Sequence, residues 1–467
     1  MSIAPLRIAL ISEHASPLAA PGSVDAGGQN IYVAHVAQAL AADGHQVDVL
    51  TRRDDPALPR AAHPWPGVQV LHIDAGPPRF VPKEALLPHM PAFAEAARQQ
   101  LRLLPPHDVL HANFFMSGWV GMALRLQFGV PLVTTFHALG LVRRAHQQEA
   151  DQFPPARIGI ERALALQSDR LIAECPQDAD DLQRLYGAPP GRISTIPCGV
   201  DTQAFRPGDK LAARQRLGLP ADAFLVLQLG RLVPRKGIDN VVRALALMRH
   251  GGRGGDARLL VVGGATPEPD EARTPEIARL RAVAAECGVA HRVLFAGRRD
   301  RPALRDWYLA ADVFATTPWY EPFGITPLEA MACGRPVVGS RVGGIQHTVV
   351  DGHTGFLVPP KDPAALAARL DQLRADPALG QAMGRAGVAR VCHHYTWTRV
   401  ARQLAGVYAA VAAQLPQDTA VPVAAAAPAR RPLAVPAALR QPAPHMPQGP
   451  HMPQGPLVAS LAGGALP

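Results

Sequence analysis

The sequence predicts an α/β protein of two doubly wound, Rossmann-like domains that face each other across a cleft. Three observations support this fold class. Short apolar runs alternate with amphipathic stretches, the alternation restarts near residue 224, and 467 residues exceed what one ordinary core holds. Nearly continuous apolar strands separated by helices are typical of a parallel sheet that is covered on both faces.

The first half contains seven predicted strands. They are RIALIS (7–12), QVDVLT (46–51), VQVLHI (68–73), DVLHAN (108–113), PLVTTFH (131–137), RLIAEC (170–175) and ISTIPC (193–198). After the first strand, Val33, Val36, Ala37 and Leu40 share one face of a predicted helix that Gly44 ends.

The second half repeats the pattern after a polar segment, 201–222, which is a predicted linker. Its predicted strands are FLVLQLG (224–230), ARLLVVGG (257–264), RVLFAG (292–297), VFATTP (313–318), PVVGS (336–340) and GFLVPP (355–360). We therefore expect domains at 1–210 and 211–395, followed by a long amphipathic helix at 396–414.

The last 53 residues differ in composition from the rest of the chain. Twelve of them are proline, and HMPQGP occurs twice in tandem at 445–456. Such a segment buries too little apolar surface to fold alone, so residues 415–467 are predicted to be a disordered Pro/Ala-rich tail.

Charge and composition disfavour several classes of protein. The net charge is +9, but the basic residues are dispersed, and a nucleic-acid-binding stripe is not expected. No apolar run approaches the ~18–20 residues of a membrane span, and the N-terminus lacks a signal-peptide layout. The five cysteines form no Cys-x-x-Cys pair, which argues against a disulfide framework or a zinc site. We expect a cytoplasmic enzyme.

Ligands of doubly wound sheets bind beyond the carboxyl ends of the strands, and two loops there carry suggestive residues. After the first strand, Gly27 and Gly28 precede a helix whose first amides suit an anion, although a plain surface loop is the alternative. After the strand at 224–230, Arg231 and Lys236 bracket a turn and could both reach one diphosphate. A solvated basic turn is the alternative there. Only four of the 47 basic residues are lysine, which favours the phosphate interpretation.

The segment EPFGITPLEAMACG (321–334) combines a predicted helix start with two carboxylates. Thr326 is a predicted N-cap with Pro327 at the first helical position, and Glu329 would complete a capping box. That role leaves Glu321 and the preceding Gly324 unexplained. The amides of Phe323, Gly324 and Ile325 would offer donors to phosphate or sugar oxygens, and each carboxylate suits a diol. The segment thus indicates a nucleotide-diphospho-sugar site.

EPFGITPLE resembles the paired-glutamate motif of retaining glycosyltransferases of family 4, which have the GT-B fold, and GRLVPRKG resembles their diphosphate-binding loop. The similarity extends over about residues 5–410. Within the family, SPLAAPGSVDAGGQNIYV is similar to D-inositol-3-phosphate glycosyltransferases, and GGQ and RIGIE are similar to sucrose-phosphate synthases. The resemblance implies an acceptor-side first domain, a nucleotide-sugar-binding second domain and a final helix that returns to the first domain.

The resemblance also implies roles for individual residues. It assigns Arg231, Lys236 and the amide of Gly28 to the donor diphosphate, and Glu329 to the ribose. It assigns Glu321 and the amides of Phe323, Gly324 and Ile325 to binding of the donor sugar. His137 is expected beside the reacting carbon.

The implied reaction is a same-face substitution in which the leaving diphosphate helps to accept the acceptor's proton. No metal and no cofactor is expected besides the nucleotide-diphospho-sugar co-substrate, for which UDP-glucose and UDP-N-acetylglucosamine are the favoured forms. The one Asp-x-Asp, at Asp178 and Asp180, is interpreted as the acidic first turn of a helix, with metal binding as the alternative.

On the acceptor side, the resemblance assigns Lys83 and Arg157 to an acceptor phosphate and Asn30 to the acceptor ring. Two positions depart from the inositol-phosphate enzymes: Phe114 replaces a tyrosine, and Ala138 replaces a threonine. We therefore expect a small polyol or sugar acceptor that carries a phosphate, and ordinary surface cations are the alternative for Lys83 and Arg157.

Several other functions remain open at this stage. They are an inactive nucleotide-sugar-binding module, a transferase with a lipid-linked or polysaccharide acceptor, a phosphorylase and a nucleic-acid-binding protein. The expected partners are the donor and a small-molecule acceptor, without nucleic acid or a membrane span, and a homodimer is an open option.

Overall fold

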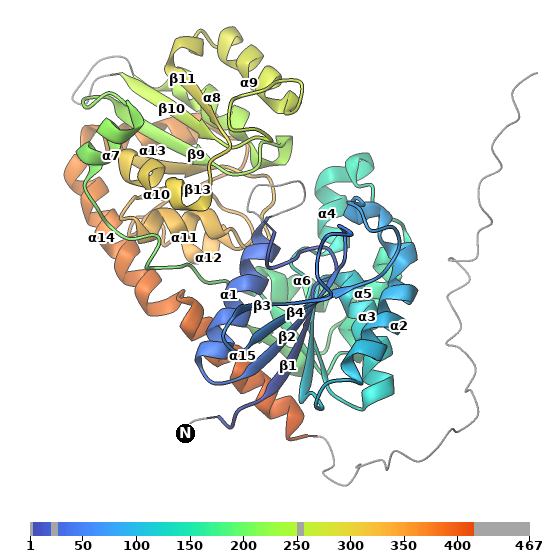
Figure 1. Ribbon diagram of the computed structural model, residues 1–467. Helices are drawn as coiled ribbons and strands as arrows, with labels where there is room; N and C mark the ends of the chain where they lie inside the picture. The colour runs from blue at the N-terminus through green and yellow to red at the C-terminus, as the bar shows by residue number, and fades with distance from the viewer. Residues whose placement is uncertain (1–2, 20–26, 250–255, 415–467) are drawn as a thin grey trace, which may run out of the picture. The chain divides into compact units, whose positions relative to one another are not determined.

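The computed structural model describes residues 3–19, 27–249 and 256–414, which lie in one compact unit that contains two separate sheets (Figure 1). The predicted Pro-rich tail, 415–467, and part of the glycine-bearing loop, 20–26, lie outside the described residues. The prediction of two parallel-sheet α/β halves is confirmed.

The first sheet has eight strands in the order β3-β4-β2-β1-β5-β6-β7-β8. Their bounds are β1 Arg7–Ile11, β2 Gln46–Arg52, β3 Ala61–Trp65, β4 Val68–Ile73, β5 Val109–Asn113, β6 Leu132–Thr135, β7 Arg170–Ala173 and β8 Ile193–Thr195. Every pairing is parallel except that of β3, which the sequence analysis missed and which runs antiparallel to β4 at the edge. Pro64 within β3 weakens the strand signal, and proline is tolerated at a sheet edge.

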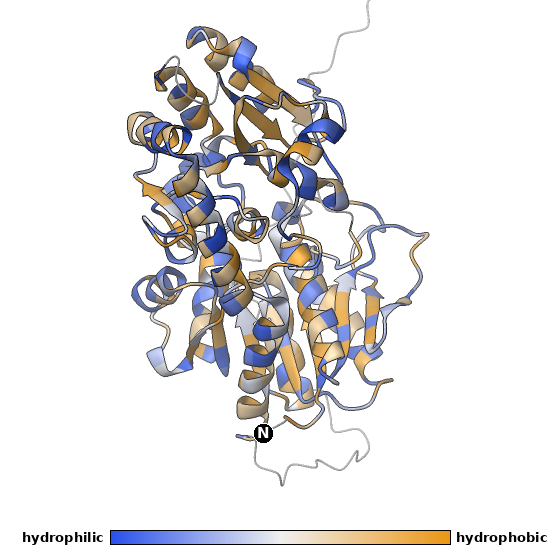
Figure 2. Cartoon of the chain, turned by 90° about the vertical axis from the view of Figure 1, so that its left-hand side faces the viewer, coloured by the Kyte–Doolittle hydropathy of each residue, from blue (hydrophilic) through white to orange (hydrophobic). Residues whose placement is uncertain are grey.

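Six α-helices connect these strands. They are α1 Gly28–Ala42, α2 Met90–Leu101, α3 Phe115–Phe128, α4 Gly140–Gln147, α5 Ala156–Gln167 and α6 Pro176–Tyr186. Helix α1 buries Val33, Val36, Ala37 and Leu40 as predicted, and Gly44 follows its end with φ +96°. Figure 2 shows the hydrophobic colour concentrated in the strands, whereas the helices carry both colours.

The second sheet has six parallel strands in the order β11-β10-β9-β12-β13-β14. Their bounds are β9 Phe224–Leu229, β10 Ala257–Val262, β11 Val293–Gly297, β12 Val313–Thr316, β13 Val337–Ser340 and β14 Gly355–Val358. The chain continues from β9 to β10 on one side of the sheet and from β12 to β13 on the other side. The topological switch point, where such sheets bind ligands, therefore lies between these two strands.

Eight α-helices belong to this half of the described chain. They are α7 Lys210–Leu217, α8 Ile238–Leu247, α9 Pro275–Glu286, α10 Arg301–Ala310, α11 Ile325–Ala332, α12 Ile345–Thr348, α13 Pro363–Ala375 and α14 Pro377–His394. Short 3₁₀ helices lie at Lys83–Ala85, Leu87–His89, Gln148–Ala150, Pro190–Arg192, Pro234–Lys236 and Ala290–Arg292.

Helix α7 corrects the prediction that 201–222 is only a linker. Asp209 caps its start, Gly218 ends it, and the helix packs against α10. Its Arg214 is buried and donates to Asp312 at 2.7 Å. The sequence analysis missed this helix because a long-range ion pair, rather than an apolar face, holds it in place.

Helix α15 (Trp397–Ala412) packs against α1 and β5 of the first half. Thr396 caps its first turn, and its apolar face buries Val400 and Leu404. The hydroxyl of Tyr408 lies 2.7 Å from Nδ1 of His111 in β5, with both residues buried. The end of the described chain thus completes the first half.

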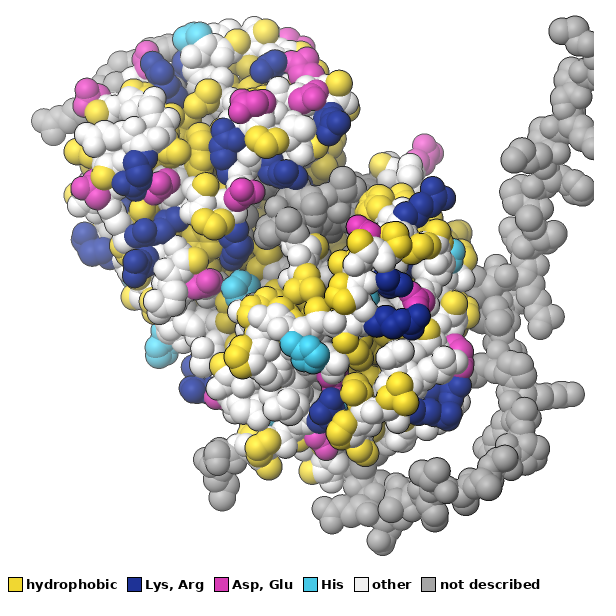
Figure 3. All heavy atoms as spheres, in the orientation of Figure 1, with side chains coloured by type: hydrophobic (Ala, Val, Ile, Leu, Met, Phe, Trp, Pro, Cys, Tyr) yellow, Lys and Arg dark blue, Asp and Glu magenta, His cyan; other side chains and the backbone are white. Residues whose placement is uncertain are grey.

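The surface drawn in Figure 3 mixes basic and acidic side chains, and no basic stripe follows that face. None of the helices among the described residues has the length and apolar content that a bilayer crossing requires.

Candidate functional site

The loops that follow β9 and β12 are locked together at the switch point of the second sheet. Thr317 donates through its hydroxyl to the carbonyl of Gly237 at 2.8 Å, and the amide of Trp319 donates to the carbonyl of Arg235 at 2.9 Å. Gly237 has φ +62°, and a Cβ there would lie 2.0 Å from the carbonyl oxygen of Thr317. Only glycine fits this approach, so the two loops are held as one rigid unit.

A part-buried ion pair joins the two loops. The ammonium of Lys236 contacts the carboxylate of Glu321, and Arg235 lies 3.7 Å from the same carboxylate. The Lys236 and Glu321 side chains are 17% and 13% exposed. Burial alone would raise the pKa of Glu321, but the charges of Lys236 and Arg235 hold it below its ordinary value. Glu321 is therefore an ionised carboxylate at neutral pH.

Arg231 immediately follows the strand-ending Gly230 and is exposed. Its charge further lowers the pKa of Glu321, so it lies in the same electrostatic cluster. The structure thus brings Arg231, Lys236 and Glu321 together. Arg235, which the sequence analysis left out, belongs to the group and covers the ring of Tyr320 at 5.8 Å.

The predicted capping box at the start of α11 is wrong. The N-cap residue is Gly324, with φ +89° and no side-chain cap, and Thr326 lies within the first turn. Glycine adopts this positive φ without strain, which lets the helix begin before Thr326. Within the described chain, the N–H groups of Phe323, Gly324 and Ile325 donate to no other residue, whereas the ring of Phe323 is buried in the core.

Glu329 lies one turn further into α11 and is 2% exposed. Its two carboxylate oxygens accept from Arg301 at 2.9 Å and from the hydroxyl of Tyr308 at 2.8 Å. Both partners come from α10, so the residue that was predicted to cap α11 instead ties it to α10. Each oxygen keeps a lone pair for a further donor.

Two glycines that the sequence analysis did not single out support the segment before α11. A Cβ on Gly343 would lie 1.8 Å from the carbonyl oxygen of Glu321, and one on Gly344 would lie 2.4 Å from Phe323. The amide of Gly344 donates to the carbonyl of Pro322 at 3.1 Å. The adjacent Gly-Gly pair is the signal that could have revealed this close approach.

The carboxyl edge of the first sheet carries a row of polar residues, all buried except His137, which is part-buried. Glu13 follows β1, Asn113 ends β5, His137 follows β6 and Glu174 follows β7. Of these, only His137 was predicted. Each of the others directly ends or follows an apolar strand, which is the signal that could have found them.

Both ring nitrogens of His137 face oxygen atoms. Nδ1 lies 3.0 Å from a carboxylate oxygen of Glu174, and Nε2 lies 3.0 Å from the side-chain oxygen of Asn113. The thiol of Cys198 also donates to Glu174, at 3.0 Å. Burial alone would raise the pKa of Glu174, but His137 holds it below its ordinary value. His137 has φ +56°, a strained conformation of the kind found at functional sites.

Two predicted site residues, Gly28 and Asn30, lie in the first turn of α1 and have different surroundings. Gly28 is the first residue of the helix, and a Cβ there would lie 3.8 Å from the side chain of Ile325 at the start of α11. The first turns of these two helices therefore adjoin. Asn30 is already engaged, because its oxygen accepts from the amide of Gly27 and its nitrogen donates to the carbonyl of Ser16, both at 3.0 Å.

Arg157 is a buried cation, so the surface-cation alternative is wrong for this residue. It is 1% exposed and bonds Glu161 at 2.7 Å and the carbonyl of Ala138 at 2.5 Å. Its guanidinium is 4.5 Å from the ring of Phe153 and 5.0 Å from that of Phe114. Its Nη1 atom is buried without a hydrogen-bond partner, which is costly for a charged group.

Lys83 opens a 3₁₀ helix, and its ammonium lies 3.9 Å from the carboxylate of Glu84. At 16% side-chain exposure it is not a fully solvated cation. A fixed position for a lysine of this kind is consistent with an anion-binding role.

Asp178 lies in the first turn of α6, as predicted for the Asp-x-Asp pair, and accepts from the amide of Glu174 at 3.0 Å. Asp180 is exposed and pairs with Arg184. Within residues 3–19, 27–249 and 256–414, no group of three or more His, Cys, Asp or Glu side chains is arranged to hold a metal ion.

Two family models match consecutive parts of the chain. Glycosyltransferase Family 4 matches residues 26–204, and Glycosyl transferases group 1 matches residues 209–390. A D-inositol 3-phosphate glycosyltransferase of Acidothermus cellulolyticus is 42% identical over 86% of this chain and 90% of its own length. One from Catenulispora acidiphila is also 42% identical, over 87% of this chain and 96% of its own length.

A solved structure supports the same grouping. Sucrose-phosphate synthase from Thermosynechococcus elongatus is 38% identical to this chain, with a TM-score of 0.80. The match covers 87% of this chain and 99% of the synthase. The GT-B fold expected from the sequence is therefore confirmed.

The part-buried pair of Lys236 and Glu321 predicts a coupling free energy larger than that of an exposed pair. Lys236→Met should lower the free energy of unfolding by about 3 kcal/mol, the low end for a broken buried pair because Arg235 remains near Glu321. Adding Glu321→Gln should restore at least ~1 kcal/mol, because it removes the uncompensated charge. Urea unfolding of the four proteins in the cycle measures this coupling.

The matched control is the exposed pair of Arg216 and Asp306, whose side chains are 54% and 29% exposed. The cycle of Arg216→Met and Asp306→Asn should give a clearly smaller coupling, because solvent screens this pair. If the changes in the free energy of unfolding for Lys236→Met and Glu321→Gln simply add, the two side chains do not interact and the prediction is contradicted.

Asp178 predicts a pH-dependent stability. Burial and then the charge of Glu174 raise the pKa of Asp178 to about 7, whereas the unfolded chain keeps a value of about 3.9. Between these values the folded chain binds more protons at this residue, so its contribution to the free energy of unfolding falls as pH rises. Asp178→Asn, which keeps an acceptor oxygen, should match wild type near pH 4 and exceed its melting temperature at pH 8.

Thermal melts from pH 4 to pH 8 check this expectation, and the comparison uses the difference between variant and wild type at each pH. Asp180→Asn, at an exposed position on the same helix, is the control. A difference that stays constant with pH would show that folding does not raise the pKa of Asp178.

Proposed function

This chain belongs to glycosyltransferase family 4, and we propose that it transfers a sugar from a nucleotide-diphospho-sugar to a hydroxyl of a small phosphorylated polyol or sugar, with retention of anomeric configuration. The part-buried ion pair of Lys236 and Glu321 is the observation that carries the proposal. It fixes a cation suited to a diphosphate beside a carboxylate suited to sugar hydroxyls.

On the donor side, Lys236 and Arg231 bind the diphosphate, and the N–H groups of Gly324 and Ile325 contribute further donors. Glu321 accepts from hydroxyls of the donor sugar through the lone pairs that Lys236 does not use. Glu329 accepts from the ribose, sharing oxygens that already bind Arg301 and Tyr308. UDP-glucose and UDP-N-acetylglucosamine are the proposed donors, on the strength of the family resemblance.

The adjoining first turns of α1 and α11 support binding of the diphosphate by both halves of the chain. Gly28 and Ile325 lie at the starts of these helices, where free N–H groups and the helix dipole favour an anion. The same groups stabilise the negative charge that develops as the diphosphate leaves. The phosphate oxygen that leaves the sugar then accepts the proton of the attacking acceptor hydroxyl. Both events take place on the same face of the donor sugar.

His137 orients the reaction from the first sheet. Glu174 fixes its Nδ1, and Asn113 holds the Nε2 that a hydroxyl of the donor sugar would share. A ring fixed at both nitrogens cannot rotate away when the substrate binds. His137 therefore provides a preorganised donor next to the reacting carbon.

On the acceptor side, the unpartnered Nη1 of Arg157 supports an anionic acceptor, because a buried guanidinium gains most from a phosphate. Lys83 supplies a second charge. Phe114 and Ala138 lack the two hydroxyls of the inositol-phosphate enzymes, so sugar phosphates are tested alongside inositol phosphate. The occupied side chain of Asn30 contributes to the acceptor ring only if it leaves Gly27 or Ser16.

A donor-by-acceptor activity screen tests the proposal, with each acceptor offered with and without its phosphate. We expect kcat/KM to be at least tenfold higher for the phosphorylated form. Lys83→Gln should remove most of that preference by raising KM for the phosphorylated acceptor alone, because the lost contact is made to the phosphate.

Arg102→Gln, at an exposed position after α2, is the control and should leave the preference unchanged. Equal rates on phosphorylated and plain acceptors in the wild type would overturn the phosphate assignment. Absence of transfer from every donor would overturn the transferase proposal itself.

A further inference from the structure

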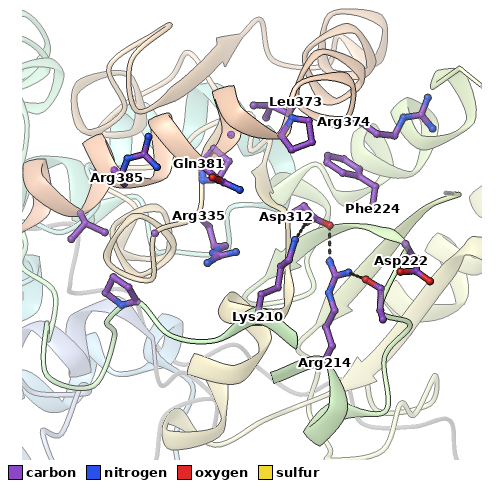
Figure 4. Close-up of a pocket in the computed structure, with 18 residues that line it drawn as sticks. Lys210, Arg214, Asp222, Phe224, Asp312, Arg335, Leu373, Arg374, Gln381 and Arg385 are labelled. Atoms are coloured by element: carbon purple, nitrogen blue, oxygen red, sulfur yellow. Dashed lines mark hydrogen bonds and ion pairs between the residues drawn. The ribbon is translucent and has the colours of Figure 1, made fainter. Parts of the chain in front are cut away.

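A pocket of about 390 Å³ lies at the opposite edge of the second sheet from the donor loops (Figure 4). Phe224 begins β9, Asp312 immediately precedes β12 and Pro336 immediately precedes β13, and all three line the pocket. Because this sheet is parallel, the amino ends of its strands meet at this edge and the donor loops at the other. The pocket is therefore separate from the proposed active site.

The lining of the pocket is strongly basic. It includes five cationic side chains, Lys210, Arg214, Arg335, Arg374 and Arg385, and two carboxylates, Asp222 and Asp312. Asp312 is already shared, since Lys210 lies 2.8 Å and Arg214 2.7 Å from its two oxygens, as the dashed lines in Figure 4 mark. Asp222 is exposed. Arg374 pairs with Asp371, outside the lining, at 3.0 Å. Arg335 and Arg385 are thus left as the positive charges that no carboxylate pairs with among the described residues.

Arg335 and Arg385 are the two lining cations that form no ion pair with a carboxylate among the described residues. The guanidinium of Arg335 donates to the carbonyls of Cys333 at 3.2 Å and Ala311 at 3.1 Å. Burial lowers the pKa of Arg335, which reflects the cost of its desolvated charge. A half-buried guanidinium with only neutral partners is a ready site for an anion.

Two further features favour an anion at the same place. Arg385 of α14 is exposed at the rim of the pocket and has no partner among the described residues. The first two turns of α14 contribute Pro377, Gly380 and Gln381 to the lining, so the positive end of this 18-residue helix lies at the pocket, where the N-cap carboxylate of Asp376 offsets part of its field. Phe224 and Leu373 supply an apolar wall.

We propose that this pocket binds a small phosphorylated metabolite, with the phosphate on Arg335 and Arg385 and the organic part against Phe224 and Leu373. The size is that of a small-molecule site rather than a macromolecular surface. Phosphate matches the charge, since a monoester carries about −1.5 to −2 at pH 7 and arginine binds its oxygens through two parallel N–H groups.

The ligand is a second molecule, distinct from both substrates. Helix α11 begins at the donor loops with Ile325 and ends beside Gly334 and Arg335, which line the pocket. A small metabolite that fills this pocket does not also reach the donor loops at the other end of α11. The proposal therefore stands independently of the donor and acceptor assignments.

Calorimetric titration of the full chain with inorganic pyrophosphate, in buffer containing excess UDP to occupy the donor loops, tests the proposal. We expect saturable binding that weakens at least tenfold in Arg335→Gln and at least threefold in Arg385→Gln. Arg335→Lys keeps the charge and should retain part of the affinity. Arg162→Gln, at an exposed position on α5 in the first half, is the control and should bind as wild type does.

Arg385→Gln keeps the test decisive if Arg335→Gln fails to fold, because Arg385 is exposed and makes no contact that folding requires. The proposal is overturned if wild type does not bind pyrophosphate in this assay. It is also overturned if Arg385→Gln and the folded Arg335 variants bind as tightly as the control. Comparison of glucose 1-phosphate with glucose then shows whether an organic phosphate occupies the pocket, and equal binding of the two would contradict the phosphate requirement.

Discussion

The parallel direction of the strands is the constraint on which the rest of the structure depends. Every pairing in both sheets is parallel except that of the edge strand β3, so the carboxyl ends of the strands lie at one edge of each sheet. Helices must then carry the chain back, and each return leaves a loop or a helix start at that edge. The candidate site consists of these loops, and the basic pocket lies at the other edge of the second sheet.

Polar groups placed at such an edge are partly removed from water, so they need partners. The chain meets this need by pairing groups, across loops for Lys236 with Glu321 and His137 with Glu174, and within helix α5 for Arg157 with Glu161. Each pair fixes a group that the substrates are proposed to contact. The cost of burial and the precision of the site therefore have the same physical origin.

Local pattern predicted every strand of the two sheets except β3, and it predicted the helix after β1. It failed where distant residues decide the outcome. Glu329 bonds to Arg301 and Tyr308 of α10 rather than capping its own helix, and Glu174 acquires its partner only when β6 and β7 lie side by side. Such pairings leave no periodic signal, because the partners are set by the topology of the sheet.

The central claim is that the loop after β9 binds the donor diphosphate, and calorimetric titration with UDP tests it most directly. Arg231 suits the measurement because it is exposed, so Arg231→Gln should fold normally. If this loop binds the diphosphate, UDP affinity should fall at least tenfold in Arg231→Gln. It should be unchanged in Arg258→Gln, because Arg258 is an exposed residue at the amino end of β10. Equal UDP affinity in the wild type and both variants would contradict the central claim.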